Sequence, residues 1–513
     1  MDEGLLESLR WASIHYVAPL GPVLDRSAPP NVPPSPPKIS NRAGERTAHG
    51  LADAVDRASV SSNRPIVVLD PAPIGLAALA QDATAASVSV CVIAPTAREV
   101  DELSRHLQSA GVVPFSVTPD AAGKDVTTAW RHLRHTPTVL VGTPKIAAWP
   151  FGAPTVVYVV EESRRAMKDR QTPTVAVRDL IIERSRQEPM TAVFAGPTPS
   201  AELMGTGPDV RRLGSGRLWP LVEVVDRRDD PPGFGLLGDV ARQAIRAVSG
   251  EGSVFVYAHR RGYAAASRCV ACRTLRTCPR CGSRPDAGDT CARCGADLGA
   301  CSNCGGERFE PLGAGVGRLI EEARRIVDDD MVGDMASRRP VRVGTERDLV
   351  TLEGCDLAIL VDVDGLIRGS NYRAAEEALR IGARIAGSVR RGGRMMVQTS
   401  DPQHHAVIAL RRADPVGFHD VELADRQMFG YPPAGQLLII EGRDLDDVDT
   451  RNAELVAVGG GVVILGPAPV PDGTRWLVQG EDLDEFKRAI RPIIGKWRDS
   501  GASVRIDADP IDL

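Results

Sequence analysis

Short, almost wholly apolar runs alternate with stretches of helical spacing between about residues 50 and 215. Five such runs have the length of strands: 66–70, 88–95, 138–143, 155–162 and 191–196. Continuous apolar runs are typical of parallel strands that are covered on both faces. The stretch 96–111 between two of them has helical spacing and ends at a glycine. The alternation predicts a doubly wound α/β domain.

A second series of apolar runs begins near Leu221 and continues, with one interruption, to about residue 401. Its strand-like segments are 222–226, 253–264, 339–345, 357–365 and 394–401. From Tyr431 onward, short strands accompany one long helical pattern over 482–501. The strand-like segments of this last part are 436–442, 462–469, 475–480 and 503–510. We therefore expect a second α/β region followed by a small α/β unit.

The N-terminal segment combines a short amphipathic pattern, from Leu5 to Ala12, with a proline-rich stretch. Six of the nine residues 29–37 are prolines, which predicts an extended, semi-rigid linker. The first residues lack a basic segment followed by an apolar one, so no signal peptide is expected. The longest apolar runs are far shorter than the roughly 20 residues that span a bilayer. The pattern favours a cytoplasmic protein without a membrane partner.

The charge balance limits the way in which the chain could bind nucleic acid. The 513 residues hold 62 basic and 67 acidic side chains, a net charge of −5, which excludes a polycation but allows a local basic face. At about 150 residues per domain, the length suggests three or four globular units. All but six basic residues are arginines; the lysines are Lys38, Lys124, Lys145, Lys168, Lys487 and Lys496.

Cysteines are concentrated in one short segment. Eight of the ten lie between residues 269 and 304, in four C-x-x-C pairs, and only Cys91 and Cys355 fall outside it. Two such pairs supply the four thiolates of a closed tetrahedral zinc site, so the segment predicts two structural zinc ions. Iron–sulfur ligation and redox thiols are the alternatives. Glycines at 282, 295 and 305, directly after three of the pairs, favour the tight turns of zinc sites.

With the cysteine segment, the sequence resembles the PriA family of bacterial replication-restart proteins. AHRRGYAAASRCVACRTLRTCPRCG (258–282) carries the resemblance most strongly. Further segments agree with family motifs in the same order: 141–151, 160–185, 195–203, 360–381, 425–436 and 507–510. Residues 5–24 are similar to the segment that closes the family's N-terminal fork-binding domain. The resemblance therefore covers nearly the whole chain.

The resemblance implies two RecA-like doubly wound helicase-type domains, a zinc ribbon inserted in the second, and a small C-terminal α/β domain. The implied divisions are a remnant of the DNA-binding domain (1–27), a Pro-rich linker (28–48), the first RecA-like domain (49–218), the start of the second (219–268), the two-zinc insert (269–310), the rest of the second domain (311–429) and the C-terminal domain (430–513). Most of the family's first domain, which is similar to a pocket for a 3′ end, has no counterpart here. The linker stands where the family has a winged-helix module.

Ligand pairing and DNA contacts are further expectations. By resemblance, the first zinc ion is held by Cys269, Cys272, Cys301 and Cys304. The second is held, also by resemblance, by Cys278, Cys281, Cys291 and Cys294. Arg260 and Arg261 are suited to phosphate contacts and Tyr263 to base stacking. A solvated basic turn beside a core tyrosine is the alternative for these three residues.

The family consists of superfamily 2 helicases, so the ATP motifs can be compared. A Walker A loop needs G-x-x-x-x-G-K-[ST], in which amides and the lysine bind phosphates and the hydroxyl binds Mg²⁺. The corresponding turn, VVLDPAPIGLAALA (67–80), has Gly75 but neither the lysine nor the hydroxyl, and G-K-[ST] occurs nowhere in the chain. No ATP is therefore expected as a cofactor.

Two further motor motifs differ from the family pattern. At the Walker B position Val160 replaces the Mg²⁺ ligand and precedes Glu161, Glu162 and Ser163. The arginine-finger segment reads RIAGSVRR (384–391), so Arg384 replaces a glutamine, Ser388 replaces the first finger and Arg391 is retained. A finger contributes about 10³–10⁵ in rate. ATP-driven unwinding is therefore not expected, and no catalytic residue is predicted.

The remaining polar residues have structural explanations. Glu161 and Glu162 are typical of helix N-terminal capping. Asp362 and Asp364 end a strand, where a turn is favoured over a metal site. His404 and His405 lie in a polar stretch, and nothing in the pattern places Ser163 in a triad.

Three functions remain as hypotheses. The first is a motorless, fork-binding primosome-assembly protein of bacterial cytoplasm and nucleoid. By resemblance, its partners are branched or forked DNA, the replicative helicase and its loader, and single-strand-binding protein. The second is a residual ATP-dependent helicase with an atypical nucleotide site. The third is a zinc-dependent protein-interaction scaffold without DNA affinity, which the acidic net charge favours.

Overall fold

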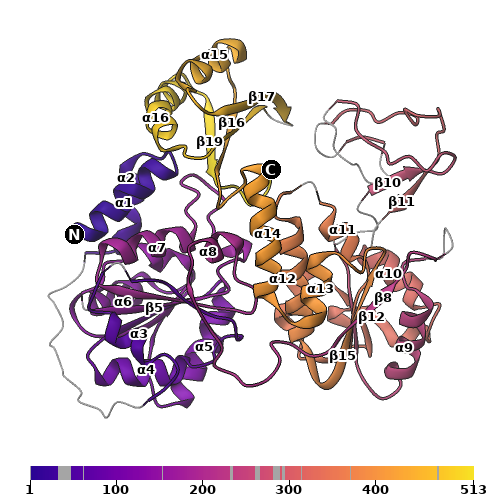
Figure 1. The fold of residues 1–513 in the computed structure, drawn as a ribbon, viewed down its shortest axis with the longest axis horizontal. Coiled ribbons are helices and arrows are strands. Elements are labelled where there is room, and N and C mark those ends of the chain that lie inside the picture. Colours follow the sequence, from indigo (N-terminus) through magenta and orange to yellow (C-terminus); the bar gives the residue numbers. More distant parts are fainter. Residues whose placement is uncertain are drawn as a thin grey trace. The chain divides into compact units, whose positions relative to one another are not determined.

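The protein divides into two compact units (Figure 1). The computed structural model describes the following residues: 2–32, 48–61, 63–152, 154–230, 235–259, 266–280, 289–291, 295–312, 315–369, 371–470 and 473–513. The first unit comprises Met1–Gly216, Leu423–Pro467 and Arg475–Ile511. The second comprises Arg217–Glu422, Ala468–Thr474 and Asp512–Leu513. The linker residues 33–47 lie outside the described part.

The first unit is built on a seven-stranded sheet of order β3-β4-β2-β5-β6-β1-β7, in which every pairing is parallel. Its strands are β1 (Ile66–Val68), β2 (Ser89–Ile93), β3 (Phe115–Val117), β4 (Val139–Gly142), β5 (Thr155–Val160), β6 (Met190–Ala195) and β7 (Asp209–Arg211). All residues of β2, β4, β5 and β6 are buried, as the continuous apolar runs predict.

Helices α3 (Ala52–Arg57), α4 (Leu76–Ala85), α5 (Ala97–Ser109), α6 (Gly123–His135), η2 (Pro144–Ala148) and α7 (Val177–Gln187) pack on this sheet. The other helices before β8 (Val222–Asp226) are α1 (Glu3–His15), which packs on α7, and α2 (Leu20–Leu24), η1 (Asp25–Ser27), η3 (Arg165–Met167) and α8 (Ala201–Gly205). The predicted helix over 96–111 is α5. Thr96 caps it by accepting a hydrogen bond from the Glu99 backbone N–H, and its apolar residues face the core.

The second unit contains a six-stranded parallel sheet of order β12-β13-β9-β14-β15-β8. Its strands are β8 (Val222–Asp226), β9 (Val254–Tyr257), β12 (Val332–Asp334), β13 (Val341–Gly344), β14 (Cys355–Leu360) and β15 (Val389–Thr399). Its helices are α9 (Asp239–Ser249), α10 (Val316–Ala323), η4 (Asp329–Met331), η5 (Met335–Ser337), η6 (Glu346–Thr351), α11 (Val363–Ile367), α12 (Ala374–Gly387) and α13 (His405–Arg412). The cysteine segment interrupts this domain between β9 and α10. It is flanked by the antiparallel pair β10 (Ala266–Cys269) and β11 (Phe309–Leu312).

A smaller α/β element forms the C-terminal part. Helix α14 (Pro415–Phe429) leads to a four-stranded sheet of order β17-β18-β16-β19. Its strands and helices are β16 (Gln436–Arg443), α15 (Val448–Val458), β17 (Val463–Val470), β18 (Gly473–Gly480), α16 (Asp484–Asp499) and β19 (Ser503–Ala508). The predicted fold class is confirmed: two doubly wound α/β domains, a cysteine-rich insert and a small C-terminal α/β domain.

A buried charge network fixes α1 to the C-terminal part of the first unit. His15 Nε2 lies 3.1 Å from Asp509 Oδ2, and its Nδ1 lies 3.2 Å from the fully buried Lys487 Nζ. Lys168 Nζ donates to the backbone oxygen of Asp509 at 2.8 Å. Burial would raise the pKa of Asp509, but His15, Lys487 and Lys168 hold it well below its usual value. The terminal DADP segment (507–510) therefore has a structural role.

Within the described residues, no helix is both long enough and apolar enough to cross a membrane.

Candidate metal centre and nucleotide turn

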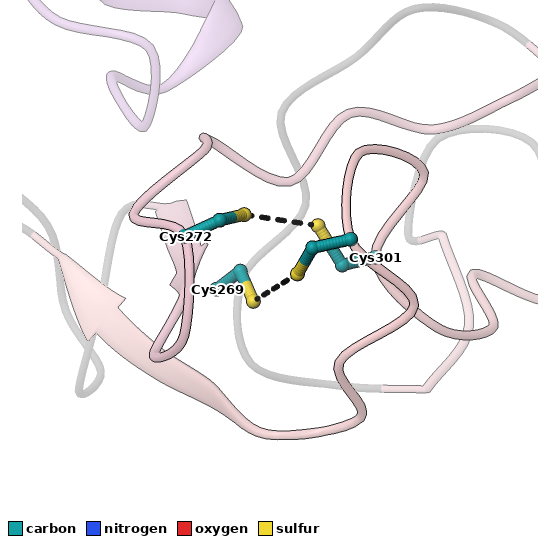
Figure 2. A group of neighbouring side chains, drawn as sticks. Cys269, Cys272 and Cys301 are labelled. Carbon is teal, nitrogen blue, oxygen red and sulfur yellow. Dashed lines mark hydrogen bonds between the residues drawn. The ribbon is translucent and has the colours of Figure 1, made fainter.

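Four cysteines converge in the insert. Cys269 ends β10 and Cys272 follows three residues later, while Cys301 and Cys304 come from the loop before β11. The Sγ atoms of Cys269 and Cys304 are 3.5 Å apart and those of Cys272 and Cys301 are 3.6 Å apart. All four sulfurs lie within 4.8 Å of one another. Figure 2 shows Cys272 and Cys301 pointing toward each other from the two loops.

These distances suit a tetrahedral ion. Zn–S bonds of about 2.3 Å place the sulfurs of a tetrahedron about 3.8 Å apart. Cys269 and Cys301 are buried, Cys272 is half-buried and Cys304 is exposed. The four residues form a group that can hold a metal ion, and four thiolates are the donor set that zinc prefers in structural sites.

The backbone repeats the same turn at three cysteine pairs. In each case, the backbone N–H four residues after the first cysteine donates to that cysteine's carbonyl. The N···O distance is 2.9 Å from Arg273 to Cys269, and 2.8 Å both from Gly295 to Cys291 and from Gly305 to Cys301. These fourth residues have φ of 60°, 68° and 70°. Glycines were expected at such positions, but Arg273 adopts the left-handed conformation with a side chain. Cys291 and Gly295 thus share this hydrogen bond and this conformation with the two pairs of the first cluster.

Hydrogen bonds to two of the sulfurs favour the thiolate, which is the form of cysteine that binds a metal ion. The Thr274 hydroxyl, 3.3 Å from the sulfur, the Thr274 backbone N–H and the Asn303 side chain lower the pKa of Cys272 to about 5. The backbone N–H groups of Cys272 and Ala271 lower the pKa of Cys269. At Cys304 the N–H of Gly306 lowers the pKa, but the neighbouring Cys272 and Cys269 sulfurs outweigh it and raise the pKa. A bound cation would favour the thiolate at all four positions.

The second predicted quartet is described only in part. Cys278 and Cys291 are buried and pack with Leu298. Cys281 and Cys294 lie outside the described residues, as do Arg260, Arg261 and Tyr263.

One arginine of the insert has a structural role. Arg276 is buried, its guanidinium carbon lies 3.9 Å from the ring centroid of Phe309, and its Nη2 donates to the Gly299 carbonyl at 2.9 Å. It therefore ties the cysteine loops to β11 and is turned away from an external phosphate.

The turn between β1 and α4 stands where the family's phosphate-binding loop lies. A phosphate loop requires a succession of free backbone N–H groups. Pro71 and Pro73 carry none. The N–H groups of Ile74 and Leu76 donate within the turn, to the carbonyls of Pro71 and Pro73 at 3.3 and 3.0 Å. Over residues 70–76, at most three backbone N–H groups remain available to a phosphate, and no two of them are adjacent in sequence.

The space beside Gly75 is occupied by the chain itself. Gly75 has φ +71°, and a methyl group at its Cα would lie 2.7 Å from Leu213 Cδ1. Leu213 also packs against Gly50, where a methyl group would lie 2.5 Å from its Cδ2. The backbone N–H of Leu213 donates to Asp70 Oδ2 at 2.6 Å, so a buried carboxylate lies at the start of the same turn. Leu76, at the lysine position of the Walker motif, is fully buried in the core.

The Walker B carboxylates have partners within the first unit. Glu161 has φ +44° and its Oε2 lies 3.1 Å from Arg164 Nη1, and Arg164 also pairs with Glu99. Glu162 is buried and accepts hydrogen bonds from the backbone N–H and hydroxyl of Ser200, at 2.7 and 3.1 Å. Ser200 is the N-cap of α8, so Glu162 supports a helix start.

The arginine-finger segment is likewise engaged within the second unit. Arg384 Nη1 and the buried Arg380 Nη1 lie 2.8 and 2.7 Å from Glu346 Oε1. Ser388 is the C-cap of α12, and its hydroxyl donates to the Ile385 carbonyl at 2.7 Å. Arg391 is exposed.

The other candidate residues take up turn and packing positions. Asp362 caps α11 by accepting from the Gly365 N–H at 2.9 Å, and Asp364 accepts from the Ser400 N–H at 2.8 Å. His404 caps α13, and its ring stacks on that of His405. The Ser163 hydroxyl donates to the Thr198 carbonyl at 2.9 Å.

The described residues thus form two parallel α/β domains, an insert in the second with four clustered cysteines that can hold a metal ion, and a small C-terminal α/β domain. Residues 427–511 match the family described as Primosomal protein N C-terminal domain.

The chain is similar to PriA. It is 27% identical over 435 residues to the probable replication restart protein PriA of Mycobacterium leprae, covering 77% of this chain and 66% of that protein. It is 24% identical over 443 residues to PriA of Synechocystis, covering 73% of this chain and 53% of that protein. The resemblance to the PriA family is therefore confirmed. The chain spans less than two thirds of the length of either relative.

Solved helicase structures align to this chain with low TM-scores and low sequence identity. Dbp5 of S. cerevisiae bound to RNA and ADP BeF3 covers 74% of this chain and 93% of its own, with a TM-score of 0.35 and 12% identity. The DUF1998 helicase MrfA bound to DNA covers 75% of this chain and 52% of its own, with a TM-score of 0.36 and 9% identity. At these scores neither alignment supports a conclusion about this chain.

Proposed function

We propose that this chain binds stalled or repaired DNA forks and promotes primosome assembly and reloading of the replicative helicase, without ATP hydrolysis or strand separation. Its similarity to replication restart proteins supports the restart role. The replicative helicase, its loader and single-strand-binding protein are the proposed partners.

One observation carries the motorless part of the proposal. At the turn between β1 and α4, Pro71 and Pro73 remove N–H groups, Leu213 fills the space beside Gly75, and the Asp70 carboxylate lies at the turn's start. A triphosphate would need amides where the turn has prolines, and a cation where it has a buried leucine. Arg212, beside the turn, is already paired with Asp70, its Nε lying 3.2 Å from Oδ1. The residue at the first finger position, Ser388, is the uncharged C-cap of α12, which supports the same conclusion.

The insert is proposed to hold two structural zinc ions. Cys269, Cys272, Cys301 and Cys304 would hold one, while Cys278, Cys281, Cys291 and Cys294 would hold the other. The shared turn geometry at Cys291 supports the second site. All eight thiolates would be used as ligands, so neither ion would have an open position for catalysis.

The charge distribution favours DNA contacts outside the C-terminal domain. Residues 430–513 hold 15 acidic and nine basic side chains, so residues 1–429 are close to neutral although the whole chain carries −5. We place the DNA contacts on the α/β domains, with Arg260 and Arg261 on phosphate and Tyr263 against a base.

Fork binding across a salt series tests this function. We expect the purified chain to bind a labelled fork, with log Kobs falling linearly with log salt concentration. Arg260→Ala with Arg261→Ala should weaken binding about tenfold and reduce the slope by about 2. Arg186→Ala with Arg228→Ala is the matched control, because it also removes two arginines, both exposed and already ion-paired. Absence of fork binding would contradict the proposal and favour a protein-interaction scaffold.

A further inference from the structure

The four sulfurs of the described cysteine cluster differ in exposure. Cys269 and Cys301 are buried and Cys272 is half-buried, whereas Cys304 is exposed. Ser302, Asn303 and Gly305 beside it are exposed as well. An oxidant in solution can therefore reach one sulfur far more easily than the other three.

A partner for the oxidised sulfur lies close by. The Cys269 Sγ is 3.5 Å from the Cys304 Sγ, on the opposite loop of the cluster. Gly306 lies against this pair: a methyl group on it would be 3.1 Å from the Cys269 sulfur and 3.4 Å from the Cys304 sulfur. Gly306 thus lies beside both sulfurs, and a side chain at this position would contact them.

We propose that Cys304 is a peroxide-sensitive modification site whose oxidation forms a Cys269–Cys304 disulfide and releases the metal ion of this cluster. The Cys304 thiolate attacks one peroxide oxygen, so an S–O bond forms, the O–O bond breaks and hydroxide leaves. The Cys269 thiolate then attacks the Cys304 sulfur, an S–S bond forms, and a second hydroxide leaves. The two thiolates lose two electrons, the peroxide is reduced to two hydroxide ions that take protons from the solvent, and two ligands are lost from the ion.

The inference rests on the proposed metal centre but not on fork binding, so the two can fail separately. Full-length protein purified with its metal is treated with hydrogen peroxide. Released zinc is followed with a chromogenic chelator, and disulfides are mapped by peptide mass spectrometry. We expect one equivalent of zinc to leave first, together with a Cys269–Cys304 disulfide.

Cys304→His is the decisive variant, since histidine can replace cysteine as a zinc ligand while removing the oxidisable sulfur. Release of the first equivalent should slow at least tenfold. Cys272→His changes the equivalent position of the other pair and should release zinc at the wild-type rate.

A second variant covers the case in which the histidine variant fails to bind metal. Gly306→Ala keeps all four ligands and places a methyl group against the Cys269 and Cys304 sulfurs, so it should slow release severalfold. Unchanged release in Gly306→Ala or Cys304→His, or a first disulfide that lacks Cys304, would overturn the proposal. Protein that contains no metal before peroxide is added would overturn it together with the metal centre.

Discussion

The PriA family resemblance implies a ligand at two sites, the cysteine cluster and the turn between β1 and α4. The residues of the cluster suit the implied ligand, whereas those of the turn do not. In the cluster, two loops 29 residues apart in sequence bring Cys272 and Cys301 to 3.6 Å, and donors surround the sulfurs. In the turn, Pro71 and Pro73 remove the amides, and the chain's own Leu213 packs against Gly75.

The difference shows what distinguishes a retained binding site from a retained fold. The strand, turn and helix around Gly75 are all present, so the α/β domain forms without a Walker lysine at this turn. The cysteine cluster has no large apolar core of its own; its described part buries only Cys278, Cys291 and Leu298 as a packed group. We therefore expect the insert to depend on the proposed metal for stability, whereas the turn needs no ligand to fold.

The largest effect is expected from removing a cysteine ligand. Cys301→Ala should lower the metal content by one equivalent and make the insert sensitive to protease, because a structural zinc ion contributes about 10–16 kcal/mol to a folded metal domain. Metal analysis and limited proteolysis measure both. Cys355→Ala removes a buried cysteine outside the cluster and should leave both unchanged. Equal metal content in the two variants would contradict the predicted dependence.

A smaller but clear effect is expected when the Walker lysine is restored. Leu76→Lys with Ala77→Thr completes G-K-T, yet we expect no nucleotide binding and a loss of roughly 3–5 kcal/mol in the free energy of unfolding, because Leu76 is fully buried in the core. Urea unfolding and nucleotide titration measure these effects. Ala77→Lys places the same charge on the next, half-buried position and should cost less than about 1 kcal/mol. Micromolar binding of Mg·ATP by the restored motif would show that the turn remains competent.

Removing the Leu213 side chain from beside the turn should have a moderate effect on stability. Leu213→Ala removes a partly buried side chain and should destabilise the first unit by about 1–3 kcal/mol. ATP should still not raise the melting temperature, since the prolines and Asp70 remain. A clear ATP-dependent rise in the melting temperature would instead identify Leu213 as the main obstacle to nucleotide.

The smallest effect tests how far the insert depends on protein contacts in addition to the metal. Arg276→Lys keeps the charge but loses the stacking on Phe309, which should cost about 0.5–1 kcal/mol and speed chelator-driven metal loss a few fold. Arg280→Lys, an exposed change in the same insert, should leave the rate unchanged. Metal loss as fast as in the Cys301→Ala variant would mean that packing rather than metal holds the loops.

Much of the fold follows from the sequence because the apolar runs of strand length are themselves the signal. The runs at 88–95 and 155–162 contain the fully buried strands β2 and β5. The C-x-x-C spacing likewise predicts pairs of metal ligands, but which two pairs meet came from the family resemblance and not from the spacing. The filling of the turn could not be predicted, because Leu213 lies far along the chain from Gly75 and only the fold brings the two together. Similarly, nothing in the sequence distinguishes Glu346 as the partner of Arg384, or Arg273 as a left-handed residue.

Nucleotide binding and hydrolysis by the purified full-length chain, measured with and without fork DNA, test the motorless function most directly. We expect the fork to bind with the same affinity in the presence and absence of Mg·ATP, and phosphate release to stay at the level of a protein-free control. Phosphate release that rises when fork DNA is added, with a rate proportional to protein concentration, would contradict the central claim.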